Sequence, residues 1–331
     1  VVASGEQVIA TGYHQFAGEA HAEVAALATV DEAVTGLTAY VTLEPCSFHG
    51  RTGPCTEVLI NRGVERVVIA ALDPNPRVNG HGVALLQQAG IRVETGLMGE
   101  QAERLNPGFI RRMRDGRPWV RIKSAVGLDG RTALQNGDSK WISSGASRRD
   151  VQRWRARSSA ILTGIGTVLA DDPSMDARLD QALQQPLKVI VDSNWRLPVD
   201  SRILNQPERV LVAGDRALEV PQDLRQCGAG ILALPLDGNG IDLGLLMQEL
   251  AQREINEVQV EAGARLCGSL LAAGLVDELL IYQAPVAMGM GGPGVFAIGP
   301  LESMTQRTHF NVLETVRIGD DLRTLYQLER R

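Results

Sequence analysis

The sequence predicts a mixed α/β fold arranged in two domains, and three observations support this prediction. Short runs rich in β-branched residues alternate with helical segments along the whole chain, which is typical of α/β proteins. The length of 331 residues is enough for two hydrophobic cores. A helical and then basic stretch at residues 101–118 separates the two halves. We therefore expect one domain at residues 1–116 and a second at residues 117–331.

The first half consists of predicted strands joined by turns and short helices. Gly5 supplies the turn between the first two strands, and Gly63 and Gly90 end two of the helices. The apolar strand at residues 66–72 is expected to be buried on both faces. The predicted strands lie at residues 1–3, 7–12, 38–43, 66–72 and 91–94, and the helices at residues 24–30, 56–62 and 83–89.

One histidine and two cysteines form a candidate metal site in this half. His21 comes in or just before the first turn of a predicted helix, whereas Cys46 and Cys55 flank a loop between a strand and a helix. One imidazole and two thiolates hold Zn²⁺ on three sides and leave the fourth position for water, as in catalytic zinc sites. Bound Zn²⁺ makes hydroxide available at neutral pH. Glu23 could then carry the water proton to a leaving amine.

Other interpretations of these residues are open at this point. A structural zinc site usually has a fourth protein ligand, and His49 is the nearby candidate. The two cysteines could also be buried thiols. A non-catalytic module stabilised by zinc and a deaminase acting on nucleic-acid bases are the two rival functions. The acidic balance of the chain, with a net charge of −6 and a pI near 5.5, argues against a dedicated nucleic-acid surface.

The metal-site residues resemble those of one particular family. His21-Ala22-Glu23 followed by Pro45-Cys46 matches the ligand pattern of zinc deaminases as a class. Most of these have two residues between the cysteines, but here eight residues, 47–54, separate them. The run P-C-S-F-H-G-R-T-G-P-C at residues 45–55 is similar throughout to a segment of the bifunctional riboflavin-biosynthesis deaminase–reductases. That family carries an opening helix and an Asn-Pro motif before the first strand, so we expect a segment to precede Val1.

The second half continues the alternation of strands and helices from Trp119 onward. A turn is predicted at residues 127–130 and an arginine-rich helix at residues 147–157. The predicted strands lie at residues 120–126, 159–164, 188–192, 209–213, 230–234, 257–260, 279–282, 310–316 and 323–328.

Two glycine-rich turns in this half could bind phosphate groups. The run G-I-G-T-V-L at residues 164–169 begins like the dinucleotide-binding fingerprint but ends in Leu169, so it does not fit. The run E-A-G-A-R-L-C-G-S at residues 261–269 follows a strand and opens a helix. Free backbone N–H groups and the helix dipole at such a position favour phosphate oxygens. We therefore prefer residues 263–269, with the turn at residues 164–167 as the alternative.

The second half resembles the reductase domain of the same family, whose fold is similar to dihydrofolate reductase. The matching segments lie at residues 122–131, 141–143, 163–173, 191–193 and 260–263. The resemblance covers nearly the whole chain. It implies an N-terminal zinc-dependent cytidine-deaminase-like α/β/α domain and a C-terminal dihydrofolate-reductase-like α/β domain that binds NADPH.

The resemblance also implies which residues bind the ligands. The implied NADPH contacts are Ala125, Trp141, Thr167, Asp171, Ser193, Gly263, Ala264, Arg265, Leu266, Cys267, Gly268 and Ser269. The implied substrate contacts are Ser139, Arg155, Met175, Arg178 and Glu261. The family tends to have Leu-Thr where this chain has Met175-Asp176, so a contact there persists if it is made through the backbone. Arg51 offers a planar donor fork that suits a ribose phosphate, although an exposed and solvated arginine is the commoner case.

The implied function is a bifunctional enzyme. The first domain would hydrolyse an amine from 2,5-diamino-6-(5-phosphoribosylamino)pyrimidin-4-one, and the second would reduce the ribosyl group to ribityl with NADPH. A ribosylamine can open to an imine whose C1′ accepts a hydride. Arg155 or Arg178 would hold the phosphate.

Composition and the absence of targeting signals predict a compartment. The chain shows no signal peptide and no run of 18 or more apolar residues, and four cysteines are too few for a disulfide scaffold. Cys227 and Cys267 are expected to be core thiols. We therefore expect a cytoplasmic enzyme with a small-molecule substrate, no nucleic-acid or membrane partner, and assembly as a homo-oligomer.

Two loops are harder to interpret. Residues 73–82 are rich in turn formers, and they form either a surface connection or, as in the family, a wall near the active site. The basic run at residues 111–118 is expected to be an irregular, solvated linker rather than a binding patch.

Overall fold

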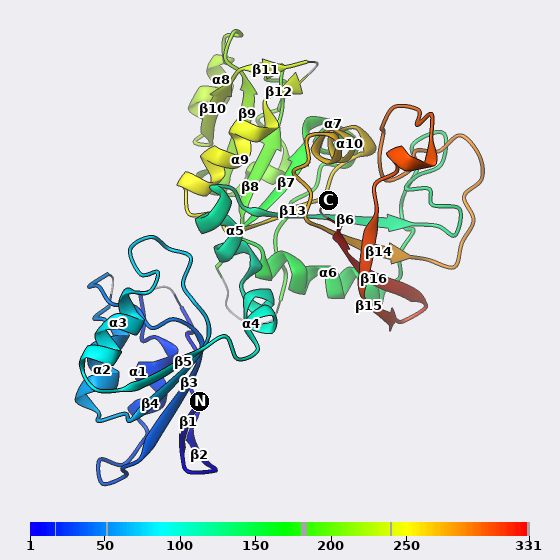
Figure 1. Cartoon of the computed structure of the whole chain (residues 1–331). Helices are drawn as coiled ribbons and strands as arrows, with labels where there is room; N and C mark the ends of the chain where they lie inside the picture. Colours follow the sequence, from blue (N-terminus) through cyan, green and yellow to red (C-terminus); the bar gives the residue numbers. More distant parts are fainter. Residues whose placement is uncertain (17, 51, 180–183, 239, 330–331) are drawn as a thin grey trace. The chain divides into compact units, whose positions relative to one another are not determined.

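The computed structural model describes residues 1–16, 18–50, 52–179, 184–238 and 240–329. The chain forms two compact units, Val1–Asp115 and Gly116–Arg331, which we describe one at a time (Figure 1). Strands and helices alternate in both units, so the predicted α/β fold class is confirmed. Within the described parts of the chain, no helix has the length and apolar character that crossing a membrane requires.

The first unit contains one five-stranded sheet in the order β2-β1-β3-β4-β5. β1 pairs antiparallel with β2 and with β3, whereas β3, β4 and β5 run parallel. The strands are β1 (Val2–Ser4), β2 (Gln7–Ala10), β3 (Leu37–Leu43), β4 (Arg66–Ala71) and β5 (Arg92–Thr95). The helices are α1 (Ala22–Leu27), α2 (Cys55–Asn61), α3 (His81–Gln88) and α4 (Gly99–Leu105). The strands and helices predicted for residues 1–94 are therefore present, with some ends shifted.

The core of the first unit joins the sheet to the helices that carry the candidate metal ligands. Leu37 and Ile69 of the sheet pack in one cluster with Leu59 of α2 and Leu86 of α3, and all four side chains are fully buried. Leu27 of α1 belongs to the same cluster. Because α1 and α2 share this core, their N-terminal ends are held on a common support.

The junction between the two halves is helical, and the prediction of an irregular basic stretch is wrong for its first part. α5 (Pro107–Asp115) includes the arginine run. Arg111 forms an ion pair with Asp115 one turn further along, and Arg114 bridges to Glu103 of α4 at 2.5 Å. An oppositely charged pair four residues apart, such as Arg111 and Asp115, stabilises a helix. The Arg114–Glu103 pair joins α5 to α4, and Ile110 of α5 is buried.

The second unit contains a nine-stranded sheet in the order β10-β9-β8-β7-β13-β6-β14-β16-β15. All neighbouring pairs are parallel except those made by β16 with β14 and β15. The strands are β6 (Trp119–Val126), β7 (Ala160–Gly164), β8 (Leu187–Val191), β9 (Val210–Asp215), β10 (Gly230–Leu234), β13 (Glu257–Val260), β14 (Glu278–Gln283), β15 (Phe310–Ile318) and β16 (Asp321–Leu328). A separate two-stranded ribbon consists of β11 (Leu236–Asp237) and β12 (Gly240–Ile241).

Helices bury both faces of the central strands. The helices are α6 (Gly145–Arg157), α7 (Ile165–Asp171), α8 (Gln222–Gln226), α9 (Leu243–Gln252) and α10 (Ala264–Ala272), with 3-10 turns at Arg202–Asn205, Pro207–Arg209 and Met304–Gln306. Leu162 and Val189 pack in the cluster that includes α9 and α10, whereas their neighbours Ile161 and Ile190 pack in a second cluster. Successive strand residues point to opposite faces, which explains the continuous apolar sequences of β7 and β8.

Helix α7 is an element that the residue pattern did not predict. It begins directly after β7 and has no side-chain cap at Gly164. The packing of Ile165 and Val168 in the second cluster stabilises it instead. Tertiary contacts of this kind leave no local signal in the sequence.

Candidate functional site

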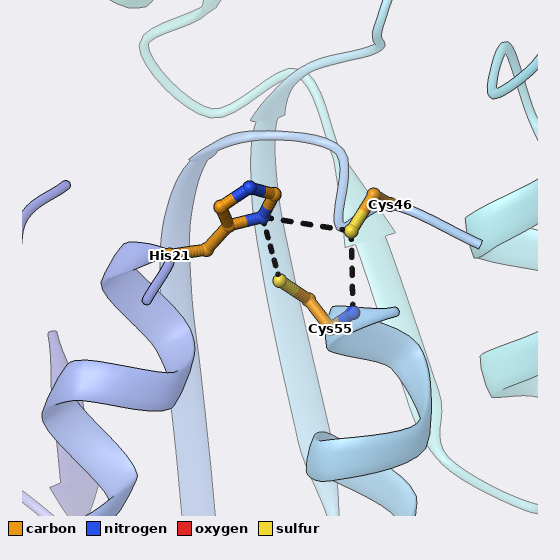
Figure 2. A group of neighbouring side chains, drawn as sticks. All are labelled: His21, Cys46 and Cys55. Carbon is orange, nitrogen blue, oxygen red and sulfur yellow. Dashed lines mark hydrogen bonds between the residues drawn. The ribbon is translucent and has the colours of Figure 1, made fainter. Parts of the chain in front are cut away.

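The three predicted metal ligands come together at one point of the first unit (Figure 2). His21 is the N-cap residue of α1, Cys46 follows β3, and Cys55 is the first residue of α2. The Nδ1 atom of His21 lies 3.1 Å from the Sγ of Cys55 and 3.5 Å from the Sγ of Cys46. All three ligand atoms lie within 4.8 Å of one another.

This group fits a zinc ion. A tetrahedral site with Zn–N near 2.0 Å and Zn–S near 2.3 Å separates its ligand atoms by roughly 3.5 Å. Imidazole and thiolate are also donors that zinc prefers. Among the residues that the structure describes, no further His, Cys, Asp or Glu joins the group. The interpretation as a structural zinc site with His49 as fourth ligand therefore finds no support.

The two thiols shift each other's pKa in opposite directions. A hydrogen bond from the Cys55 thiol, helped by the Cys55 backbone N–H at 3.2 Å, lowers the pKa of Cys46 to about 5. The same hydrogen bond, together with burial, raises the pKa of Cys55. One sulfur is thus a ready anionic ligand, and a metal ion would displace the proton from the other.

Glu23 lies in the first turn of α1, two residues after His21. Burial raises the pKa of its carboxyl group, although its backbone N–H and His21 act in the opposite direction. Its carboxyl group also influences the pKa of Cys55, so the two side chains are close. Glu23 is therefore beside the metal ligands without joining the group that they form.

The surroundings of His21 fix its ring. Thr52 Oγ1 lies 3.4 Å from His21 Nε2, the ring nitrogen that does not face the sulfurs. A partner of this kind fixes the tautomer and orientation of a ligating histidine. Gly12 lets the preceding segment approach α1 closely, because a Cβ there would come within 2.2 Å of the Ala22 carbonyl oxygen. Even alanine at position 12 would therefore push the start of α1 away.

A buried glutamate organises the loop at residues 73–82. Glu44 is 3% exposed and accepts hydrogen bonds from the backbone N–H groups of Asp73, Gly80 and Val83, at 3.3, 3.0 and 3.2 Å. Glu44 lies between β3 and Cys46, so these bonds hold the loop against the metal-site segment. The sequence pattern did not predict this role for Glu44. The signal available in the sequence was a charged residue directly after a predicted strand.

The loop also reaches the insertion between the two cysteines. The Arg77 guanidinium lies 4.2 Å from the centre of the Phe48 ring, a cation–π contact. Of the two interpretations of residues 73–82, the structure favours the wall near the metal site. Arg51, predicted to bind a phosphate, lies outside the described residues.

In the second unit, the residues predicted to bind NADPH and substrate lie along one edge of the sheet, where the parallel central strands end. Ala125 is near the end of β6, Thr167 and Asp171 are in α7 after β7, Ser193 follows β8, and residues 261–269 follow β13. These four strands are parallel and adjacent in the order β8-β7-β13-β6. The carboxyl ends of parallel strands are where open α/β sheets bind their ligands.

An ion pair lies at the centre of this edge. Arg155 Nε and Nη2 donate to the two carboxylate oxygens of Glu261, at 2.7 and 2.9 Å. Gln259 Nε2 donates to the same carboxylate at 2.8 Å. Burial alone would raise the pKa of Glu261, but the Arg155 charge and its hydrogen bonds lower that pKa to about 2. Two predicted substrate residues are therefore directly bonded to each other.

Lys123 is a candidate site residue that the sequence interpretation missed. It lies in β6, and burial lowers the pKa of its ammonium group, an effect that Arg155 strengthens and Glu261 opposes. The signal available in the sequence was a lysine in the interior of a predicted strand that also contains Arg121 and Ser124. A partly buried amine beside a carboxylate can donate hydrogen bonds to a polar ligand.

The proposed phosphate loop has an open N-terminal end. Gly263 is the N-cap of α10, and nothing lies within 4 Å of the position that a Cβ would occupy there. Cys267 is buried and donates to the Ala262 carbonyl, and a Cβ on Gly268 would meet the Ala297 backbone at 2.3 Å. Residues 267–268 therefore face the protein interior, and a cofactor would meet the first residues of the loop.

Two other predicted ligand residues, Ser139 and Trp141, lie in the long loop after β6. The Trp141 side chain is 72% exposed, and the Arg148 guanidinium lies 4.6 Å from the centre of its ring. Lys140 forms an ion pair with Asp171 of α7 at 3.1 Å. That pair joins this loop to the helix that carries Thr167.

The remaining predicted substrate residues differ in exposure. Met175 is 4% exposed, and its side chain packs in the second core cluster, behind Arg155. A substrate could therefore reach Met175 only through its backbone. Arg178 is exposed, and its backbone N–H donates to Gln152 Oε1 at 3.0 Å. Cys227 and Cys267 are both free thiols, and Cys267 lies in the core as predicted.

Comparison with known families matches both units. Residues 1–71 match the family described as the cytidine and deoxycytidylate deaminase zinc-binding region. Residues 118–324 match the family described as the RibD C-terminal domain.

Full-length relatives match nearly the whole chain. The riboflavin biosynthesis protein RibD of Escherichia coli (strain K12) is 45% identical over 336 residues, covering 97% of this chain and 90% of the relative. The structure of Acinetobacter baumannii RibD, form 1, is 42% identical with a TM-score of 0.92, covering 100% of this chain and 91% of that one. A Thermotoga maritima structure, named as a diaminohydroxyphosphoribosylaminopyrimidine deaminase and 5-amino-6-(5-phosphoribosylamino)uracil reductase, is 30% identical with a TM-score of 0.84 and covers 99% and 90%.

Proposed function

The chain belongs to the RibD family of bifunctional riboflavin-biosynthesis deaminases and reductases, and we propose that residues 1–116 carry out the deamination and residues 117–331 the reduction. The observation that carries the first assignment is the His21, Cys46 and Cys55 group with Glu23 beside it. The second assignment rests on the residues predicted to bind NADPH and substrate, which lie in a row at the carboxyl ends of β8, β7, β13 and β6.

The proposed deaminase substrate is 2,5-diamino-6-(5-phosphoribosylamino)pyrimidin-4-one, in agreement with the activity named for the Thermotoga maritima relative. Hydrolysis replaces the exocyclic amino group with oxygen and releases ammonia. When bound, Zn²⁺ supplies a Lewis acid that lowers the pKa of a water molecule toward neutrality. His21, Cys46 and Cys55 would hold the ion, and Thr52 orients the His21 ring.

Glu23 is the proposed proton carrier in this unit. Its carboxylate accepts a proton from the attacking water and delivers it to the departing amine. Its position in the first turn of α1, directly after the His21 ligand, supports this role. Glu44 holds the loop at residues 73–82 as one wall of the site.

The proposed reductase reaction converts the ribosyl group of the deaminated product to ribityl. When bound, NADPH supplies the hydride that the open-chain imine accepts at C1′. The free N–H groups at the start of α10 would hold the cofactor phosphates. Lys123, Arg155 and Glu261 lie at the middle of the row of strand ends and would orient the pyrimidine and ribosyl groups there.

Arg178 is the better candidate for the substrate phosphate. Arg155 is already paired with Glu261, whereas Arg178 is exposed and forms no ion pair within the part of the chain that the structure describes. Its planar guanidinium suits bidentate phosphate binding. A cytoplasmic location and assembly as a homo-oligomer remain proposals from the sequence.

One assay separates this function from its rivals. The purified protein is given the diaminopyrimidine substrate with and without NADPH, and ammonia release and NADPH oxidation are followed. We expect ammonia in both cases and NADPH oxidation only after deamination. Ammonia release from single-stranded DNA or cytidine, but not from this substrate, would indicate a base deaminase. No ammonia from any of them by the zinc-loaded protein would indicate a binding module.

A further inference from the structure

A buried lysine and an aspartate anchor the segment at residues 175–178, which we call the Arg178 segment. Lys188 lies in β8, and its side chain is 1% exposed. Its ammonium group lies 2.7 Å from the Asp176 carboxylate and 3.3 Å from the Ile203 carbonyl oxygen. An ammonium group removed from water needs a charged or hydrogen-bonding partner, so Lys188 holds Asp176 in place.

The backbone of the same aspartate is bonded to the reductase site. The Asp176 carbonyl oxygen accepts a hydrogen bond from Arg155 Nη1 at 2.9 Å. The other nitrogens of the same guanidinium bind Glu261. A continuous series of polar contacts therefore runs from Lys188 in the sheet, through Asp176 and Arg155, to Glu261.

The next two residues of the segment are also fixed through their backbones. Gln185 accepts from the Ala177 N–H at 2.9 Å and donates to the Ala177 carbonyl at 2.8 Å. Gln152 of α6 accepts from the Arg178 N–H at 3.0 Å. The backbone that presents the exposed Arg178 side chain is thus bonded at Asp176, Ala177 and Arg178.

We propose that Asp176, held in place by Lys188, is a positioning residue for the reductase reaction that sets the place of Arg155 and Arg178 against the phosphorylated substrate. The proposal rests on the proposed function of the second unit. Asp176 differs from Gln185 and Gln152 because its partner is a buried charge, and losing that partner leaves the charge unpaired. Its carboxylate faces Lys188, so its contribution to the substrate site passes through its backbone carbonyl.

A double-mutant cycle tests the proposal with Asp176→Asn, Lys188→Met and the double variant. The KM values for the deaminated phosphoribosylamino substrate and for NADPH are measured separately. We expect each single variant to raise the substrate KM by about five- to thirtyfold, the ratio that corresponds to 1–2 kcal/mol. The NADPH KM should stay within about twofold, and the double variant should be no worse than the poorer single variant.

Two outcomes would overturn the proposal. If Asp176→Asn raises the substrate KM as much in the Lys188→Met background as in the native one, Asp176 acts on the substrate directly. If no variant changes the substrate KM, the Lys188–Asp176 pair does not position Arg155 and Arg178 for substrate binding. Asp176→Glu, which keeps the carboxylate, should restore part of the lost affinity. Glu249→Gln, which breaks the exposed Arg253–Glu249 pair of α9, is the matched control and should change neither KM.

Hydrogen exchange keeps the proposal testable without catalysis. Amides 177 and 178 should exchange faster in Asp176→Asn than in the native protein, and unchanged exchange there would overturn the proposal. If the single variant does not fold, the double variant removes both charges and replaces the lysine with a side chain of similar volume. A native protein that binds the substrate but never oxidises NADPH would instead refute the proposed reductase function. The exchange rates of amides 177 and 178 would still show whether the Lys188–Asp176 pair holds the Arg178 segment in place.

Discussion

The backbone N–H of Cys55 donates a hydrogen bond to the Sγ of Cys46, so the second metal-ligand cysteine orients the first. Thr56 donates from both its N–H and its hydroxyl to the Cys46 carbonyl, each at 3.2 Å. The start of α2 therefore holds both ends of the insertion at residues 47–54 together. The longer spacing between the cysteines forms a closed loop and leaves the ligand geometry of a zinc deaminase intact.

The first prediction concerns the metal. The native protein should contain about one zinc per chain, as expected for a site with three protein ligands. Cys55→Ser replaces a thiolate with a hydroxyl that binds zinc weakly, so metal analysis of that variant should find little zinc. Cys227→Ser changes a thiol outside the group and is the control, with full zinc content expected. Full zinc in Cys55→Ser would contradict the ligand assignment.

The second prediction concerns the buried Glu44. Replacing it with alanine removes the acceptor of three backbone N–H groups, and each unsatisfied buried donor costs about 1–3 kcal/mol. The loop at residues 73–82 should loosen, and the deaminase kcat/KM should fall by at least about tenfold, which corresponds to 1.4 kcal/mol. NADPH oxidation with the deaminated substrate should be unchanged. Glu57→Ala, on the exposed side of α2, is the control, and an equal loss there would remove the argument for Glu44.

The third prediction concerns pH and Glu261. Its pKa is lowered from 4.5 to about 2 in the folded protein. Because the folded-state pKa is the lower one, the resulting stabilisation is present above pH 4.5 and is lost as the pH falls toward 2. It amounts to about 3 kcal/mol at roughly 1.4 kcal/mol per pKa unit. Glu261→Gln should therefore destabilise the second unit at pH 7, and the difference from the native protein should shrink below pH 4.5.

Tryptophan fluorescence during urea unfolding measures this effect on the full chain. All tryptophans belong to the second unit, so the signal reports on that unit: Trp119, Trp141, Trp154 and Trp195. A stability difference that stays constant from pH 7 to pH 3 would show that the Arg155 ion pair does not set the titration of Glu261.

The fourth prediction concerns the cofactor phosphates. A Cβ at Gly263 meets nothing within 4 Å, so Gly263→Val should leave the fold unchanged and occupy the space that the phosphates need. We expect the NADPH KM to rise at least about tenfold, which corresponds to 1.4 kcal/mol, and deamination to be unaffected. Gly166, in α7, has equally open surroundings and provides a matched Gly166→Val variant. If only that variant weakens NADPH binding, the phosphates lie at the turn of residues 164–167.

Local patterns predicted most of the fold and the metal ligands. Alternating apolar strands and the spacing of His21, Cys46 and Cys55 are visible within short stretches of sequence. Glu44 and Lys123 could not be assigned in this way, because their roles depend on partners that other elements bring to them. The same limit applies to α5, whose arginines pair with Asp115 and with Glu103 of α4, and to α7, which packing stabilises.

Asp176 shows the limit most clearly. The sequence shows only that Met175-Asp176 stands where the family tends to have Leu-Thr. The structure shows that Met175 is buried and that Asp176 pairs with Lys188, twelve residues further along the chain. A departure from a family pattern therefore needs the three-dimensional partner before it can be interpreted.

The most direct test of the account is the Glu23→Gln variant. Glutamine keeps the shape of the side chain but cannot accept a proton, and Glu23 is outside the metal-ligand group. The variant should retain about one zinc per chain, as a site with three intact ligands does, and should release almost no ammonia from the diaminopyrimidine substrate. It should still oxidise NADPH at the native rate with the deaminated substrate. Ammonia release at the native rate by zinc-loaded Glu23→Gln would contradict the assignment of Glu23 as the proton carrier of the deaminase.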